Sequence, residues 1–113
     1  MDCPAFLDDE GRREWFRLAP HVFAIVGASQ KTAERLGRYN ALFLEWRRLG
    51  LYLREHGCWR TTRKGWRFRP EYIREQKVQR MMHYLSAQLG MSPLARARIR
   101  ARQARRNTPR PGA

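Results

Sequence analysis

The sequence predicts a mainly α-helical fold for one small domain, and three observations support this class. Apolar residues recur at three- and four-residue intervals along two stretches, which is the period of an amphipathic helix. The longest break in this period, between residues 58 and 69, is short and rich in Trp and Thr. Apolar residues make up 42% of the 113 residues, which is enough for one compact core.

The first expected helix begins near the acidic start of the chain. Asp8 or Asp9 can cap it, because a carboxylate accepts hydrogen bonds from the free N–H groups of a first helical turn. Pro20 lacks a backbone donor, so we expect this helix to end near Ala19. A loop or partial turn is then expected as far as about Ala28.

A long amphipathic helix is expected between Ser29, which has the chemistry of an N-cap, and Gly57, which favours a helix end. The apolar residues that recur on one side of it are Leu36, Tyr39, Phe43, Trp46, Leu49 and Leu53. Four more apolar residues widen this face beyond what one small core uses, so we expect them to form contacts between subunits. These residues are Leu42, Leu44, Leu51 and Tyr52.

The segment 58–69, with Lys64-Gly65 at its centre, predicts a short hairpin or an ordered loop. Pro70 favours the first position of another helix, and Gly90 favours its end. The apolar stripe of this helix comprises Val78, Met81, Met82, Leu85 and Leu89. Ser92-Pro93 has the chemistry of the cap and first residue of a last helix.

Charge divides the chain into three parts: an acidic segment at 1–14, a helical core and oligomerisation domain at 15–92, and a basic Ala/Arg segment at 93–113. Lys and Arg number 24 against 10 acidic residues, a net charge of +14. Such a surplus predicts a polyanionic partner, with nucleic acid favoured over an anionic membrane. We find no apolar run of membrane-spanning length and no signal peptide, so we expect an intracellular protein.

No catalytic residue, cofactor or metal ion is expected. The glycines are scattered and form neither a Walker loop nor a dinucleotide fingerprint. The acidic cluster Asp8–Glu10 is typical of a helix cap, and Cys3 with Cys58 makes neither a disulfide framework nor a paired zinc site. Nothing in the sequence places the histidines in a catalytic triad; they are His21, His56 and His83.

A run of arginines near the C-terminus is the strongest local signal for nucleic-acid binding, because guanidinium groups bind phosphate bidentately and no acidic residue follows Glu75. On a helix these arginines leave only a thin apolar stripe, expected at Leu94, Ala97, Ala101 and Ala104. We therefore expect the segment to be weakly anchored, docking on a partner or staying mobile until it meets an anion. The arginines are Arg96, Arg98, Arg100, Arg102, Arg105 and Arg106.

A second basic cluster lies in the expected hairpin and comprises Arg60, Arg63, Lys64, Arg67 and Arg69, the first four of which are expected to contact DNA. It alternates with Trp59, Trp66 and Phe68, whose rings could stack on the bases of single strands or anchor the hairpin to the core. Anchoring is the favoured interpretation, because two short strands need apolar cover to persist. The cations are expected to face solvent and to bind DNA.

Three sequence motifs occur in an order that resembles a family of phage small terminase subunits. They are the tryptophan-to-proline motif at 15–20, Arg69-Pro70 after an aromatic and basic turn, and the segment 89–99, in which Leu-Gly, Ser-Pro and alternating Ala and Arg follow a helix. This sequence departs from the family pattern in the Gly-Ala-Ser-Gln entry to the long helix, where acidic caps are usual. It also has Arg69 where a histidine is often found.

The resemblance implies a non-catalytic subunit that forms a homo-oligomeric ring in the cytoplasm of the bacterial host. Such a subunit binds double-stranded viral DNA and delivers it to the large terminase subunit, which holds the ATPase and nuclease; the portal protein is a further candidate partner. The acidic segment either covers the basic tail or faces another protein. Two alternatives remain open at this point: a dimeric helical transcription regulator and an RNA-binding accessory protein.

Overall fold

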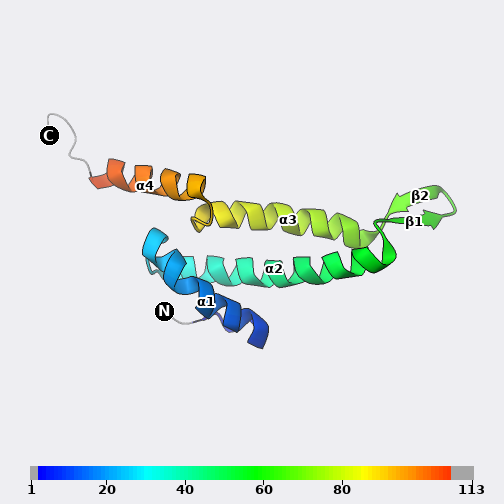
Figure 1. Cartoon of the computed structure of the whole chain (residues 1–113), viewed down its shortest axis with the longest axis horizontal. Coiled ribbons are helices and arrows are strands. Elements are labelled where there is room, and N and C mark those ends of the chain that lie inside the picture. Colours follow the sequence, from blue (N-terminus) through cyan, green and yellow to red (C-terminus); the bar gives the residue numbers. More distant parts are fainter. Residues whose placement is uncertain (1–2, 108–113) are drawn as a thin grey trace.

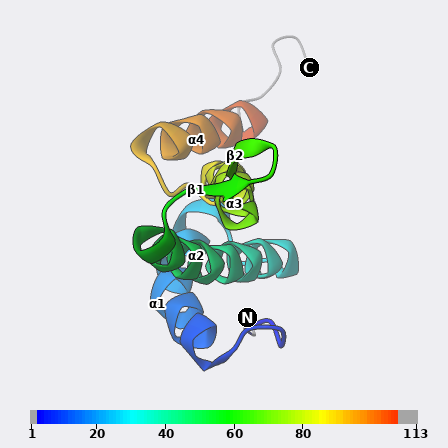
Figure 2. The ribbon, with the colours of Figure 1, turned by 90° about the vertical axis from the view of Figure 1, so that its right-hand side faces the viewer.

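The computed structural model describes residues 3–107 and contains four helices and one two-stranded hairpin. The elements are α1 (Asp9–Val26), α2 (Gln30–His56), β1 (Trp59–Thr62), β2 (Gly65–Phe68), α3 (Pro70–Gln88) and α4 (Pro93–Asn107). Helices α2 and α3 lie side by side and antiparallel, with the β-hairpin at one end of the pair and α4 at the other (Figure 1). The molecule is elongated, with extents of 70 × 34 × 19 Å. Seen end-on, α1, α2, α3 and α4 are stacked in sequence order (Figure 2).

Helix α1 begins as expected but does not end at Pro20. The side chain of Asp8 caps it by accepting a hydrogen bond of 2.8 Å from the N–H of Gly11. The helix then continues through Pro20 to Val26, so the expectation of an early end was wrong. Trp15, Ala19 and Val22 share one face and are all buried, and this packing outweighs the one backbone hydrogen bond that Pro20 removes.

The main core forms where α1 crosses the first half of α2. Trp15, only 1% exposed, packs with Ala33 and Leu36 of α2 and with Leu89 at the end of α3. The N-terminal segment closes this region, since a Cβ atom on Gly37 would lie 2.6 Å from Pro4 Cγ. Only glycine at this position allows so close an approach between the segment and the helix.

Helix α2 begins and ends at the residues that the sequence indicated. Ser29 accepts a hydrogen bond from the N–H of Thr32 at 3.1 Å, and Gly57 ends the helix with φ 80°. Towards the hairpin, polar contacts join α2 to α3: Trp46 Nε1 donates to Glu75 Oε1 at 2.8 Å, and Arg74 makes a bidentate pair with Glu45.

The segment 58–69 is a β-hairpin in which Trp59 pairs with Phe68 and Thr62 with Gly65. The Thr62 hydroxyl accepts from the N–H of Lys64 and donates to the Gly65 carbonyl, while Gly65 takes the positive φ of 102° that the turn requires. The Trp59 ring stacks on Phe68, which stacks in turn on Tyr72 of α3. This stack ties the hairpin to α3, but the hairpin rings remain largely exposed and do not enter the core.

A tight turn places α4 against the ends of α1 and α3. Gly90, with φ 68°, lets the N–H of Met91 reach the Ser86 carbonyl at 3.0 Å, and Ser92 then caps α4. The buried face of α4 is Ala95 and Ile99, not the stripe that we expected from the sequence. That expected stripe is exposed in the structure: Leu94, Ala97, Ala101 and Ala104.

Helix α4 is therefore better anchored than the sequence suggested. Ile99 packs inward, and one turn further on Gln103 Nε2 donates to the Ile25 carbonyl of α1 at 3.3 Å. The first three turns are thus fixed to the helical core, while the last arginines extend beyond it. The end of the basic segment, residues 108–113, lies outside the described residues.

Candidate nucleic-acid interface

The β-hairpin separates its cations from its aromatic rings. Because successive side chains of a strand point to opposite faces, Trp59 and Phe68 lie on one face and Arg60 and Arg67 on the other. Arg60 and Arg67 are direct cross-strand partners, an arrangement in which like charges repel. In the described part of the chain no carboxylate pairs with either of them, so an external anion is the natural counter-charge.

The turn of the hairpin adds Arg63 and Lys64, both exposed. This geometry disfavours the stacking of single-stranded bases, because such sites place phosphate-binding cations beside the stacking rings. In this hairpin the strand cations and the rings face opposite ways. The cation face is suited to a phosphate backbone, and the ring face to an apolar surface.

The six predicted arginines of α4 do not form one uniform group. Arg96 is half-buried, and its guanidinium donates to the Gly90 carbonyl at 3.5 Å, so it supports the turn before α4. The other five are exposed, and none forms an ion pair with a carboxylate of residues 3–107. They are Arg98, Arg100, Arg102, Arg105 and Arg106.

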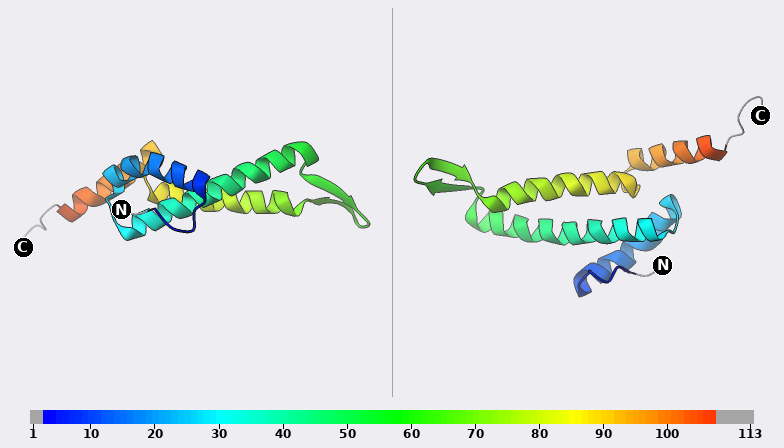
Figure 3. Two further views of the ribbon diagram at one scale, coloured as in Figure 1. Left: turned by 90° about the horizontal axis from the view of Figure 1, so that it is seen from below. Right: turned by 180° about the vertical axis from the view of Figure 1, so that it is seen from behind.

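The hairpin cations and the α4 arginines lie at opposite ends of the molecule (Figure 3). The α2–α3 pair separates them, and a helix of 27 residues is roughly 40 Å long. One subunit therefore does not combine the two predicted clusters into a single surface. Each cluster forms a separate candidate contact with nucleic acid.

A third group of cations was missed by the sequence analysis. Lys31, Arg35 and Arg38 of α2 face Arg80 of α3 across a groove of about 600 Å³. Their spacing on α2, one helical turn between neighbours, is a signal that the sequence does contain. That Arg80 lies opposite them follows only from the antiparallel pairing of α2 with α3, which the sequence pattern does not specify.

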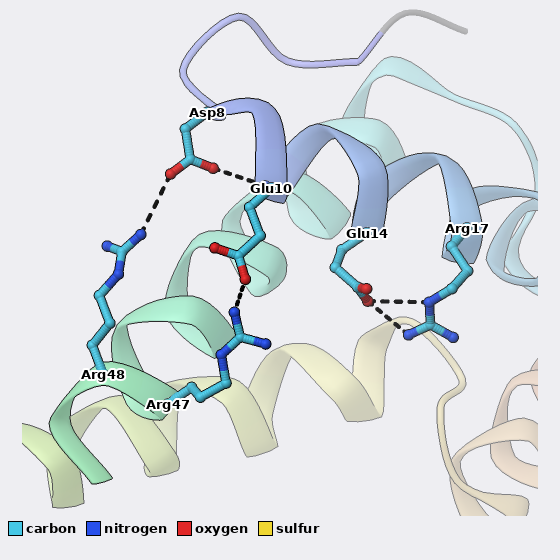
Figure 4. A network of polar contacts seen from close by, with 7 residues as sticks. Asp8, Glu10, Glu14, Arg17, Arg47 and Arg48 are labelled. Carbon is cyan, nitrogen blue, oxygen red and sulfur yellow. Dashed lines mark hydrogen bonds and ion pairs between the residues drawn. The ribbon is translucent and has the colours of Figure 1, made fainter. Parts of the chain in front are cut away.

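The acidic segment contacts α2 and not the basic tail (Figure 4). Asp8 pairs with Arg48 at 3.4 Å, Glu10 pairs with Arg47, and Glu14 pairs with Arg17 within α1. Among the described residues these carboxylates neutralise helix cations near the middle of the molecule. Within residues 3–107, none of these three carboxylates pairs with an arginine of α4.

The four residues expected at a subunit contact have different environments. Leu44 is only 4% exposed and is part of the chain's own core, so the expectation that it forms surplus surface was wrong. Leu42 and Tyr52 are half-buried, and Leu51 is 56% exposed. Other large apolar side chains exposed at the hairpin end are Trp59, Trp66, Phe68 and Ile73.

Within residues 3–107, no group of three or more His, Cys, Asp or Glu side chains is placed to hold a metal ion. Burial raises the pKa of the Cys3 thiol, and the smaller effect of the Arg12 charge lowers it. The net rise in pKa disfavours the reactive thiolate form of Cys3. None of the helices in this same range is both long and apolar enough to span a bilayer.

The family model for the phage terminase small subunit matches residues 11–106. This range contains all four helices and the hairpin, apart from the first two residues of α1 and the last residue of α4. No curated protein and no solved structure shows significant similarity to the chain. The matched region contains both basic clusters and the core that separates them. The chain thus belongs to the family of phage terminase small subunits, whose role is in phage DNA packaging.

Proposed function

We propose that this terminase small subunit binds double-stranded viral DNA and delivers it to the large terminase subunit in the host cytoplasm, without catalysis of its own. The observation that carries the proposal is the arrangement of α4. Its inner face is fixed by Ala95 and Ile99, while five arginines face solvent and none pairs with a carboxylate of residues 3–107. A helix held in this way carries guanidinium groups around its exposed surface, where they are available to phosphates.

The binding mechanism is electrostatic. Each phosphate that an arginine neutralises releases condensed counterions, so affinity is sensitive to salt and depends little on base sequence. Several subunits in a homo-oligomeric ring would sum this modest contribution into multivalent binding. Sequence preference would then come mainly from the shape and bending of the DNA.

The proposed ring contact uses the apolar surface at the hairpin end. Leu51 and the hairpin rings of Trp59, Trp66 and Phe68 are 41% to 66% exposed, and exposed apolar side chains grouped in this way mark a candidate interaction site. A heterologous contact repeated around a closed ring would cover it. Tyr52, which is half-buried and follows Leu51 in α2, is placed in the same contact. Leu42 lines the groove between α2 and α3 and Leu44 is buried, so neither belongs to it.

A functional assay with the cognate large terminase subunit tests the proposal. The purified chain alone should neither hydrolyse ATP nor cleave DNA, and it should change both activities of the large subunit when the two are mixed. Turnover by the chain itself that survives repurification would overturn the non-catalytic role. Failure to alter the large subunit in the presence of duplex DNA would overturn the delivery role.

The hairpin supports a second arrangement, in which Arg60, Arg63, Lys64 and Arg67 carry the DNA while α4 binds the large subunit or the portal. Truncation after Ser92 separates the two arrangements. If α4 binds DNA, truncation lowers duplex affinity; if the hairpin does, truncation leaves that affinity unchanged and abolishes stimulation of the large subunit.

The other two classes of function are tested by the mass of the native particle. A ring of many subunits agrees with the terminase role, a dimer with a transcription regulator, and a monomer with an RNA-binding accessory protein. The regulator is already disfavoured, because a β-hairpin joins α2 to α3 in place of the tight turn of a helix-turn-helix motif.

A further inference from the structure

The groove between α2 and α3 combines a basic rim with an apolar floor. Its rim is formed by Lys31, Arg35 and Arg38 on one side and Arg80 on the other. Leu42, Met81 and Leu85 line it between the helices, and the Tyr84 ring, 65% exposed, stands at its edge. This end of the helix pair is far from the hairpin (Figure 1).

The rim cations outnumber the carboxylates of the groove lining by four to one. None of the four takes part in an ion pair within the described residues. Glu34 is the one carboxylate in the lining, and it accepts a hydrogen bond from Gln30 at 3.4 Å. Four like charges around one groove repel each other, so a ligand with negative charge would bind there favourably.

The apolar floor distinguishes between two kinds of anionic ligand. A DNA backbone offers phosphates to the rim but no apolar group to cover Leu42, Met81 or Tyr84. An amphipathic protein helix with acidic flanks offers both, and a groove between two antiparallel helices is a recurrent receptor for such a helix. The lining positions of α2 run from residue 31 to residue 42, about 16 Å or three helical turns.

We infer that this groove docks an acidic amphipathic helix of a partner protein. Apolar side chains at i, i+3 or i+4, and i+7 of that helix cover Leu42, Met81 and Tyr84, and its flanking carboxylates pair with Arg35, Arg38 and Arg80. Tyr84 and Gln88 line both this groove and a neighbouring hollow, which Arg98 and Arg102 of α4 also line. One end of the docked helix therefore lies beside α4. This docking does not depend on the proposed binding of DNA.

A binding assay with a defined probe tests the inference. The probe is a stapled, fluorescently labelled 14-residue helix with leucines on one face and glutamates on both flanks, titrated against the full chain by anisotropy. Arg35→Glu combined with Arg38→Glu should weaken its binding by about tenfold or more. The matched control, Arg60→Glu combined with Arg63→Glu, makes the same charge change at the hairpin and should leave binding within about twofold.

A second variant separates docking from general attraction to a basic protein. Tyr84→Ala removes apolar surface at the edge of the groove without a charge change, and the exposed position of Tyr84 leaves folding unaffected. This variant should bind the probe several-fold more weakly. The inference is overturned if the parent chain does not bind the probe. It is also overturned if the two charge variants lose probe affinity equally, or if Tyr84→Ala binds the probe as tightly as the parent. A greater loss of duplex affinity in the Arg35/Arg38 variant than in the Arg60/Arg63 variant would also overturn it, because the groove would then bind DNA. So would loss of oligomer mass in the Arg35/Arg38 variant, because the groove would then bind a second copy.

Discussion

The indole Nε1 of Trp15 donates a buried hydrogen bond of 3.2 Å to the backbone carbonyl of Ala33. This contact fixes α1 on α2, and both residues lie in the main core. The tryptophan-to-proline motif near the start of the chain thus has a structural role. The family resemblance that rests partly on this motif reflects the fold, and the proposed DNA contacts lie on other residues.

Trp15→Phe should therefore lower the free energy of unfolding by about 1 to 3 kcal/mol, because the variant loses the hydrogen bond and leaves part of the ring volume empty. Urea denaturation measures this change. Trp66→Phe is the matched control, since Trp66 is 66% exposed, and it should stay within about 0.5 kcal/mol of the parent. Equal effects of the two substitutions would contradict the role given to Trp15.

Two glycines should respond in opposite directions to the same substitution. Gly90 has φ 68°, and a Cβ there would lie 3.0 Å from Ile25 Cγ2, so Gly90→Ala should destabilise the chain by about 1 to 2 kcal/mol. Gly50 is inside α2 with nothing within 4 Å of its Cβ position, so Gly50→Ala should stabilise by about 0.5 to 1 kcal/mol. Thermal melts of both variants test the signs, and a stabilised Gly90→Ala variant would refute the tight turn before α4.

Stability should fall at high pH because of Tyr39. Burial raises the pKa of Tyr39 above its ordinary value of 10.0 in the folded state. As the pH rises, Tyr39 therefore ionises in the unfolded chain before it ionises in the folded chain. Its contribution to the free energy of unfolding is complete below pH 10 and is lost as the pH rises through the pKa of Tyr39 in the folded chain. Melting temperatures between pH 8 and pH 11 should fall less steeply for Tyr39→Phe than for the parent, and parallel curves would show that burial of this hydroxyl is unimportant.

Assembly should depend on the apolar surface at the hairpin end. Leu51→Glu places a charge in the proposed subunit contact and should reduce the mass measured by light scattering at micromolar concentration. Leu94→Glu is a suitable control because Leu94 is 60% exposed but lies on α4, at the other end of the molecule. A parent chain that is already monomeric would contradict the proposed ring.

Most of the fold could be predicted from local chemistry. The caps at Asp8, Ser29 and Ser92, and the helix ends at Gly57 and Gly90, depend on side chains and glycines that act on their own backbone. Such effects are visible in a sequence because donor and acceptor are only a few residues apart.

The errors came from contacts between distant residues. Pro20 was expected to end α1, but burial of Ala19 and Val22 against the core keeps the helix intact. The buried face of α4 was misplaced because Ile99 packs on elements that no period in the sequence identifies. In the candidate site, the exposed arginines were found from composition, whereas the role of Arg96 in the turn and the position of Arg80 at the groove required the tertiary structure.

The measurement that tests the proposed DNA binding most directly is the salt dependence of duplex affinity. The variant replaces the five exposed arginines of α4 with glutamine and keeps Arg96, so folding should be unchanged. If about four of them contact phosphates in each bound subunit, the slope of log K against log salt should flatten by roughly 3 to 4 per subunit, equally on unrelated duplexes. An unchanged slope in this variant would show that α4 does not carry the DNA, most clearly if glutamine at Arg60, Arg63, Lys64 and Arg67 flattens the slope instead.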